Sequence, residues 1–349
     1  MITQLVKIEG TENDAFIINE AAEILCRGGL VAFPTETVYG LGADGTRDDA
    51  AMAIYSAKGR PADNPLILHI AKAADAELYA YTSPLYYELS KRFMPGPLTI
   101  VLPAKETVPK EVRASLPTVA VRCPAHPVAH ALIKKAGVAI AAPSANLSGS
   151  PSPTCAKHVY DDMNGRIDMI IDGGECEIGV ESTIVKLLGD DSMQLLRPGK
   201  ITKEQLEDVG RVVVAEAVTG ELKPGQVAES PGMKYKHYAP KSQLILLKGN
   251  NKSRQNYILS QNKPCAVMCY TEELELFRET LGDNFVFDLG PEHDTLTHCR
   301  HLFKLLRLAD LSGVEVIYAP LPIKEGIGLA LYNRMIRAAA HYIIETEGG

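Results

Sequence analysis

The chain has 349 residues, of which 46% are hydrophobic and 23% charged, and its formal net charge is −7. This balance is typical of a globular protein and excludes a fibrous repeat or a long disordered chain. The length predicts two domains. No apolar run approaches the roughly 20 residues that cross a bilayer, and the N-terminus lacks the basic and then apolar segments of a secretion signal. We therefore expect a cytoplasmic protein with no membrane partner.

The charge is unevenly distributed along the chain. Residues 58–122 carry nine basic and six acidic side chains, although the whole chain is acidic. Overall negative charge disfavours a protein that holds nucleic acid through its phosphates alone. The local excess of cations fits a small anionic ligand better than a long polyanion.

The cysteines and histidines do not predict a metal site. Seven cysteines, an odd number, indicate reduced thiols. The nearest pair, Cys265 and Cys269, lies in an apolar run and is expected to pack in a core. His126 and His130 have the spacing of two ligands on one helix face, but no third ligand is near, which favours a surface or capping role. We expect no tightly bound metal held by the protein.

Residues 1–210 form the first predicted domain. Short runs rich in β-branched residues alternate there with helical patterns, which predicts an α/β domain with a mixed sheet. Strands are expected at residues 30–33, 66–70, 98–102, 119–122, 138–142, 169–172 and 182–188. Helices are expected near residues 16–27, 48–58, 84–93, 126–136 and 202–208.

A long linker and a smaller α/β domain are predicted next. Residues 211–242 are rich in proline, glycine and lysine, and a segment of this length without regular structure is usually functional. In residues 243–349, strands are expected in "QLILLK", "PCAVMCY", "NFVFDL" and "VEVIYAP". Helices are expected there at residues 295–312 and 328–345.

The stretch "GLGADG" has the glycine spacing of a dinucleotide-binding loop. In such a loop the glycines join a strand directly to a helix, whereas here a proline and the loop "TETVYG" intervene. The position therefore disfavours a nicotinamide or flavin site. The preceding loop instead presents Thr35, Thr37 and Tyr39, whose hydroxyls could bind a small polar ligand. A threonine-rich turn is the alternative.

Two cations, Lys58 and Arg60, stand one glycine apart between a predicted helix and a predicted strand. They could converge on one set of phosphate oxygens, with a solvated charged face as the alternative.

His69 lies on the following strand among apolar residues, where a histidine is more often part of a core. Arg122 ends another apolar strand and must meet a ligand, a carboxylate or solvent, because burying it unpaired would cost several kcal/mol.

The stretch "VAIAAPSANLSGSPSPT", residues 138–154, ends a buried strand and then offers hydroxyls and an amide among small residues. Groups of this kind, with free backbone N–H groups, can hold a phosphate or a ribose. A flexible serine-rich linker is the alternative. No Ser-His-Asp order and no pair of acids stands out, so the sequence does not indicate a protein nucleophile.

Together these stretches resemble the threonylcarbamoyl-AMP synthase family, whose catalytic module is the YrdC-like domain. The resemblance rests on "FPTETVYGLGAD", "KGRPADNPLILHI", "PGPLTIVL", "VAVRCPAHP", "APSANLSGSPSPT", "GVESTIV" and "LRPGKIT", which span about residues 15–205 in order. The linker and second domain are similar to the two-domain form of the family. The resemblance thus implies a YrdC-like twisted mixed sheet with flanking helices, followed by a smaller Rossmann-like α/β domain.

The resemblance also implies an adenylate-forming nucleotidyltransferase. It would make L-threonylcarbamoyladenylate and pyrophosphate from L-threonine, bicarbonate or CO₂, and ATP, with Mg²⁺ accompanying the nucleotide. The product would serve threonylcarbamoyladenosine modification of tRNA beside the anticodon, through a separate tRNA threonylcarbamoyl transferase. Direct tRNA binding stays open. Because N-carboxylated threonine would attack the α-phosphate, positioning and charge neutralisation would be the main needs of catalysis.

The binding residues of the family can be carried over to the matching positions. Lys58 and Arg60 would act on the triphosphate, and Arg122 would pair with the carboxylate of threonine. The implied threonine-binding residues are Thr35, His69, Arg122, Ala142 and Ser182. The implied ATP-binding residues are Lys58, Arg60, Asn64, Thr118, Ser144, Asn146, Ser152 and Arg197. In the linker, Tyr235, His237 and Tyr238 would form a lid over the active site.

Two other functions remain open at this stage. An RNA-binding module could use the same locally basic surface, and it would show salt-sensitive RNA binding without ATP turnover. A related carbamoyl-adenylate enzyme would act on carbamoyl phosphate. Such proteins usually carry acyl-phosphatase and cysteine-rich zinc-finger segments, and the spacing of the seven cysteines does not match such a finger.

Overall fold

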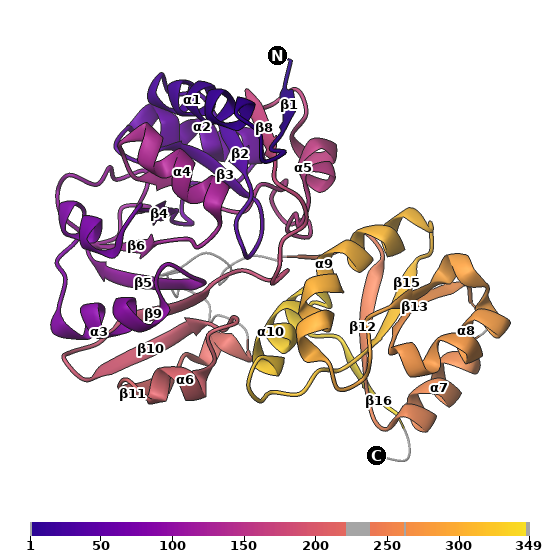
Figure 1. Ribbon diagram of the computed structural model, residues 1–349. Helices are drawn as coiled ribbons and strands as arrows, with labels where there is room; N and C mark the ends of the chain where they lie inside the picture. Colours follow the sequence, from indigo (N-terminus) through magenta and orange to yellow (C-terminus); the bar gives the residue numbers. More distant parts are fainter. Residues whose placement is uncertain (1, 221–237, 262, 347–349) are drawn as a thin grey trace. The chain divides into compact units, whose positions relative to one another are not determined.

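The computed structural model describes residues 2–220, 238–261 and 263–346 (Figure 1). The chain divides into two compact units, Met1–Ser148 with Ser152–Tyr235 and Gly149–Pro151 with Lys236–Gly349. Much of the linker expected at 211–242 falls outside the described residues, so its limits stay a prediction. Within the described residues, no helix is long and apolar enough to cross a membrane.

The first unit is built on a sheet of eleven strands in the order β1-β8-β2-β3-β7-β4-β6-β5-β9-β10-β11. These are β1 (Gln4–Lys7), β2 (Val31–Phe33), β3 (Gly40–Asp44), β4 (Ile67–His69), β5 (Leu98–Pro103), β6 (Thr118–Arg122), β7 (Ile140–Ala141), β8 (Met169–Asp172), β9 (Thr183–Leu187), β10 (Ser192–Arg197) and β11 (Arg211–Val214). Strands β2 and β3 are antiparallel whereas β4 and β6 are parallel. The mixed sheet expected from the sequence is therefore confirmed.

Helices flank this sheet and enclose its core. They are α1 (Asn13–Cys26), α2 (Asp48–Lys58), α3 (Pro84–Phe93), α4 (Pro127–Ala136), α5 (Ala156–Met163) and α6 (Lys203–Glu207). Side chains of α1 and α4 pack with those of β2 and β8, as Leu25, Leu132, Phe33 and Ile171 illustrate (Figure 1). Each such burial stabilises the fold by about 1.5–3 kcal/mol. The core thus fixes the strands whose ends carry the polar loops.

The end of α2 matters for the cationic motif. Gly59 caps the helix in the left-handed conformation, with φ of 59°, which a residue with a side chain adopts at a cost. The chain therefore turns directly after Lys58, and Arg60 lies beyond the end of the helix.

Some elements of the first unit were not predicted, namely α5 and strands β1, β3, β10 and β11. Strand β3 contains two glycines and lacks the β-branched residues that indicate a strand. A Cβ atom on Gly42 would lie 2.8 Å from both Ile140 and Phe33, so close packing against neighbouring strands requires the glycine. Strand β11 pairs with β10, which places residues 211–214 in the sheet.

The second unit contains a five-stranded parallel sheet in the order β14-β13-β15-β12-β16. Its strands are β12 (Gln243–Lys248), β13 (Cys265–Cys269), β14 (Val286–Asp288), β15 (Val316–Pro320) and β16 (Ile343–Glu345). Its α-helices are α7 (Asn251–Leu259), α8 (Leu274–Leu281), α9 (Thr295–Leu311) and α10 (Gly328–Ala338). The smaller α/β domain is confirmed. The strand order differs from the 3-2-1-4-5-6 order of the dinucleotide-binding fold, so the Rossmann-like label is not confirmed.

One predicted helix was too long. The helix expected at 328–345 ends at Ala338, and residues 343–345 form β16 beside β12. Ala340 and His341 have positive φ values of 46° and 62°, which stop the helix and reverse the chain. Because the alternation of apolar residues continues past this turn, the sequence pattern did not show that the helix ends there.

Candidate active site

The loop between β2 and β3 is held by the hydroxyl of Thr35. Its Oγ1 donates to the carbonyl of Val38 at 2.6 Å and accepts from the backbone N–H groups of Thr37 and Val38 at 3.1 and 3.2 Å. Thr35 is 1% exposed. The predicted threonine-rich turn is therefore present, with Thr35 shaping its backbone, and ligand binding by this loop stays a prediction.

A buried ion pair joins this loop to the end of β6. Arg122 Nη2 donates to Glu36 Oε1 at 2.6 Å, Nη1 donates to Thr37 Oγ1 at 3.0 Å, and Nε donates to the carbonyl of Gly96 at 3.4 Å. Glu36 Oε2 accepts from the backbone N–H of Ala125. Burial would raise the pKa of Glu36, but attraction to Arg122 and the hydrogen bond from it outweigh burial and lower that pKa. Glu36 is therefore a carboxylate, and Arg122 keeps donors for a second anion.

His69 lies next to this ion pair. On the paired strands β4 and β6, His69 is the residue opposite Arg122. Burial, followed by repulsion from Arg122, lowers the pKa of His69 to about 3. Its Nδ1 lies 3.1 Å from the carbonyl of Ile67. His69 is thus a neutral, buried group beside Arg122 at physiological pH. The core position that the sequence favoured is confirmed, and its role in threonine binding stays a prediction.

Lys58 reaches from α2 into the serine-rich loop. Its Nζ donates to the carbonyls of Ser144 and Asn146, each at 2.5 Å. The side chain is buried, and burial, followed by repulsion from Arg60, lowers the pKa of Lys58 well below its ordinary value. A second cation beside a buried ammonium is unfavourable without an anion. This arrangement fits a site that is completed by a polyanion.

Arg60 and Asn64 frame the same corner of the site. Arg60 Nη2 donates to the carbonyls of Asn64 and Pro65 at 3.2 and 3.3 Å. Within the described part of the chain, neither the nitrogen nor the oxygen of the Asn64 side chain has a hydrogen-bond partner, although the residue is fully buried. Leaving a buried amide unsatisfied costs about 1–3 kcal/mol. The side-chain amide of Asn64 can therefore hydrogen-bond a polar group from outside the protein.

The threonine-rich loop and the serine-rich loop lie side by side. The backbone N–H of Tyr39 donates to the carbonyl of Pro153, and its carbonyl accepts from the N–H of Ala145, both at 2.9 Å. Ala142 precedes the serine-rich loop, and its N–H donates to the carbonyl of Ile67. The predicted threonine-binding and ATP-binding groups from these loops therefore converge on one region of the first unit.

A third polar group forms around the start of β9. Arg197 Nε and Nη2 donate to the carbonyl and the hydroxyl of Ser182, both at 3.0 Å, and the Ser182 hydroxyl lies 2.8 Å from Thr99 Oγ1. The sequence had placed Ser182 and Arg197 in different ligand sets, and the structure brings them into direct contact. Ser152 donates to the carboxylate of Glu181 at 2.5 Å. Both residues are buried.

Comparison with known proteins decides the family. A family model described as "Telomere recombination" matches residues 23–199, and one described as "Threonylcarbamoyl-AMP synthase, C-terminal domain" matches residues 201–340. A threonylcarbamoyl-AMP synthase from Pyrococcus abyssi is 45% identical over 335 residues, which are 94% of this chain and 96% of that protein. The chain belongs to the threonylcarbamoyl-AMP synthase family. The resemblance found in the sequence motifs is therefore confirmed.

Other relatives of the threonylcarbamoyl-AMP synthase family agree. The Bacillus subtilis threonylcarbamoyl-AMP synthase is 43% identical and matches 94% of each chain. A crystal structure of P. abyssi Sua5 complexed with L-threonine is 42% identical, covers 99% of this chain and 100% of that chain, and gives a TM-score of 0.88. The fold is thus that of the two-domain members of the family.

The roles predicted for Thr118 and for the lid residues stay predictions. Thr118 begins β6 whereas Arg122 ends it, so the two lie about 13 Å apart along the strand. In the proposed lid, Tyr235 and His237 lie outside the described residues. Tyr238 is buried, and its ring packs against Phe303 of the second unit, with centroids 5.3 Å apart.

Sequence reasoning did not single out two buried acids that contact predicted site residues, namely Glu36 beside Arg122 and Glu181 beside Ser152. Glu36 stands in the loop that was discussed for its hydroxyls, and Glu181 stands in "GVESTIV", which was quoted only for the family resemblance. The available signal was an acid in apolar company, which must find a cation or a hydrogen-bond donor when buried. His126, in contrast, caps α4 by accepting from the N–H of Val128, in agreement with the capping role that was favoured.

Proposed function

We propose that the chain is a threonylcarbamoyl-AMP synthase that converts L-threonine, bicarbonate or CO₂, and ATP into L-threonylcarbamoyladenylate and pyrophosphate. The observation that carries the proposal is the 45% identity over 94% of the chain to a protein of that name. The buried groups Lys58, Arg122 and Asn64 of the first unit support it, because they can hold a polyanion, a carboxylate and a polar ligand.

Threonine would bind at the ion pair of Arg122 and Glu36. Three of the five N–H groups of a guanidinium are used by Glu36, Thr37 and Gly96, and the remaining donors would receive the amino-acid carboxylate. His69, being neutral, would add no second charge. Thr35 would act through the backbone that it shapes, and Ala142 and Ser182 would complete the wall.

ATP would bind along the serine-rich loop. Lys58 and Arg60 would neutralise the triphosphate, and Asn64 would satisfy its amide on the nucleotide. Ser144, Asn146 and Ser152 would line the adenylate, with Arg197 behind Ser182. An oxygen of the N-carboxylated threonine would form a bond to the α-phosphorus while the bond from the α-phosphorus to the bridging oxygen breaks, and that oxygen would leave with pyrophosphate. The residues would act by positioning and by charge.

Mg²⁺ would accompany the nucleotide. Within the described residues, no three or more histidine, cysteine, aspartate or glutamate side chains are grouped so that they could hold a metal ion. The phosphates would contribute ligands to the ion, which usually also keeps several waters. The cytoplasmic location, the use of bicarbonate and the transfer of product to a tRNA threonylcarbamoyl transferase belong to the same proposal.

The proposal is tested by measuring pyrophosphate release from ATP by the full chain with Mg²⁺. Release should require both L-threonine and bicarbonate, and the adenylate should be detectable by mass spectrometry. Release that is independent of both substrates would contradict the proposal. Salt-sensitive RNA binding without turnover would favour the RNA-binding alternative.

Replacing Asn64 by Leu should separate stability from binding. Because the amide is buried without a partner, the apo protein should become as stable or more stable by up to about 1 kcal/mol. Loss of hydrogen bonds to the nucleotide should weaken ATP binding by about tenfold or more. Thermal unfolding and calorimetric titration measure the two effects. Asn164→Leu, at an exposed helix end, is the matched control, and unchanged ATP affinity in Asn64→Leu would remove Asn64 from the site.

A further inference from the structure

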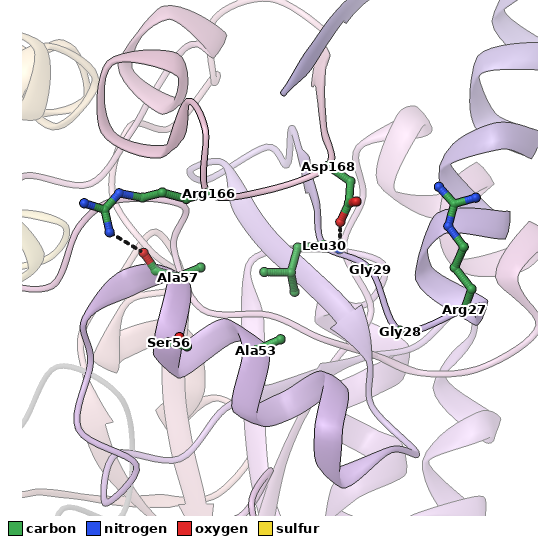
Figure 2. Close-up of a pocket in the computed structure, with 9 residues that line it drawn as sticks. All are labelled: Arg27, Gly28, Gly29, Leu30, Ala53, Ser56, Ala57, Arg166 and Asp168. Atoms are coloured by element: carbon green, nitrogen blue, oxygen red, sulfur yellow. Dashed lines mark hydrogen bonds between the residues drawn. The ribbon is translucent and has the colours of Figure 1, made fainter. Parts of the chain in front are cut away.

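One cavity of the first unit is lined by residues outside the predicted ligand set. It has a volume of about 610 Å³ and lies between the end of α1, the start of β2, α2, and the turn before β8 (Figure 2). Its lining residues are Arg27, Gly28, Gly29, Leu30, Ala53, Ser56, Ala57, Arg166 and Asp168. None of them is among the residues proposed to bind threonine or ATP.

The cavity has cations at its two ends. Figure 2 shows Arg27 and Arg166 on opposite sides, with Asp168 and Leu30 between them. Arg166 Nη1 donates to the carbonyl of Ala57 at 3.4 Å, a long bond that uses one of its five N–H groups. Both arginines are exposed. They are therefore available to an oxyanion that enters the cavity, and a planar guanidinium favours phosphate or carboxylate in a bidentate arrangement.

Asp168 gives the cavity a second kind of recognition. Its Oδ2 accepts from the N–H of Leu30 at 2.8 Å, which fixes the carboxylate at the wall of the cavity. A Cβ atom on Gly29 would lie 2.8 Å from Oδ2, so glycine lets the carboxylate approach the backbone closely here. A fixed carboxylate between two cations selects a ligand that carries donors, such as hydroxyl groups, behind its anionic end. Leu30, Ala53 and Ala57 offer an apolar surface to the body of that ligand.

We propose that this cavity binds a phosphorylated pentose, either as a sugar phosphate or as a nucleoside monophosphate. The phosphate pairs with Arg166 or Arg27, and the sugar hydroxyls donate to Asp168. A simple anion meets only an arginine, whereas a pentose phosphate meets an arginine with its phosphate and Asp168 with its hydroxyls. Because Ala57, the partner of Arg166, directly precedes Lys58 on α2, the occupant lies one residue from the proposed catalytic cation.

The test is calorimetric titration of the full chain with ribose 5-phosphate and, separately, with AMP. We expect binding in the millimolar range or tighter, weakened about tenfold or more by Arg166→Gln and about fivefold by Arg27→Gln. Asp168→Asn retains an acceptor for Leu30 and should weaken binding about fivefold. Arg92→Gln, at an exposed arginine paired with Asp208, is the matched control. Thermal unfolding of each variant verifies that it folds.

The two ligands distinguish the source of the phosphate. If Arg166→Gln weakens ribose 5-phosphate but not AMP, the ligand is a sugar phosphate, and AMP binding that survives belongs to the nucleotide site. If Arg166→Gln weakens AMP alone, the ligand is a nucleoside monophosphate. Equal affinities in the parent chain, Arg166→Gln and Arg27→Gln, or no binding of either ligand at millimolar concentration, would overturn the proposal.

Discussion

Replacing Arg122 by Ala should lower kcat/KM for threonine by about 1000-fold or more, which corresponds to about 4 kcal/mol. The guanidinium is the buried cation proposed to receive the amino-acid carboxylate. The same change leaves Glu36 charged and buried without its partner, and breaking a buried pair in this way destabilises a protein by about 3–5 kcal/mol. Thermal unfolding should therefore shift as well, and this shift has to be separated from the loss of binding.

A double variant makes the separation. Arg122→Met with Glu36→Gln removes both charges and keeps similar side-chain volumes, so most of the stability should return. Threonine-dependent pyrophosphate release should stay low, because the carboxylate still lacks its cation. Glu36→Gln alone keeps Arg122 and should retain measurable threonine use. Recovery of turnover in the double variant would show that Arg122 supports the fold and does not bind threonine.

The sequence predicted the polar groups at strand ends better than it predicted their partners. Arg122 was expected to meet a ligand, a carboxylate or solvent, and it meets the carboxylate of Glu36. That pairing joins residues 86 positions apart, and local periodicity carries no information on such distances. The contact between Ser182 and Arg197 was missed for the same reason, because it depends on the pairing of β9 with β10.

Local sequence patterns predicted regular helices and strands, but they failed where contacts with distant parts of the chain determine the structure. Helix α2 and strand β8 have the predicted limits, since apolar periodicity and flanking turns agree there. Strand β3 was not predicted because glycines do not indicate a strand in the sequence. Their presence is explained by close packing against Phe33 and Ile140, which lie on other strands. The unsatisfied amide of Asn64 could not be foreseen either, since it is a property of the folded site.

Lys58→Ala should reduce kcat/KM for ATP by about 100-fold or more, which corresponds to about 2.7 kcal/mol. Two effects of the substitution contribute to this decrease in kcat/KM. The triphosphate loses a buried cation, and the carbonyls of Ser144 and Asn146 lose the ammonium that holds their loop. Lys157→Met, at an exposed lysine paired with Asp161, should leave turnover unchanged. Full activity in Lys58→Ala would remove this residue from the proposed mechanism.

A proton measurement distinguishes the charge of Lys58 from its role in the loop. Burial and the nearby Arg60 lower the pKa of Lys58 in the apo protein, and a bound triphosphate should raise that pKa again. ATP binding should therefore take up protons at pH values between the two pKa values, as measured by calorimetry in buffers of different ionisation enthalpy. Lys58→Met should lose this uptake while keeping the aliphatic stem. Uptake that persists in Lys58→Met would assign the proton to another group and leave Lys58 only its contact with the loop.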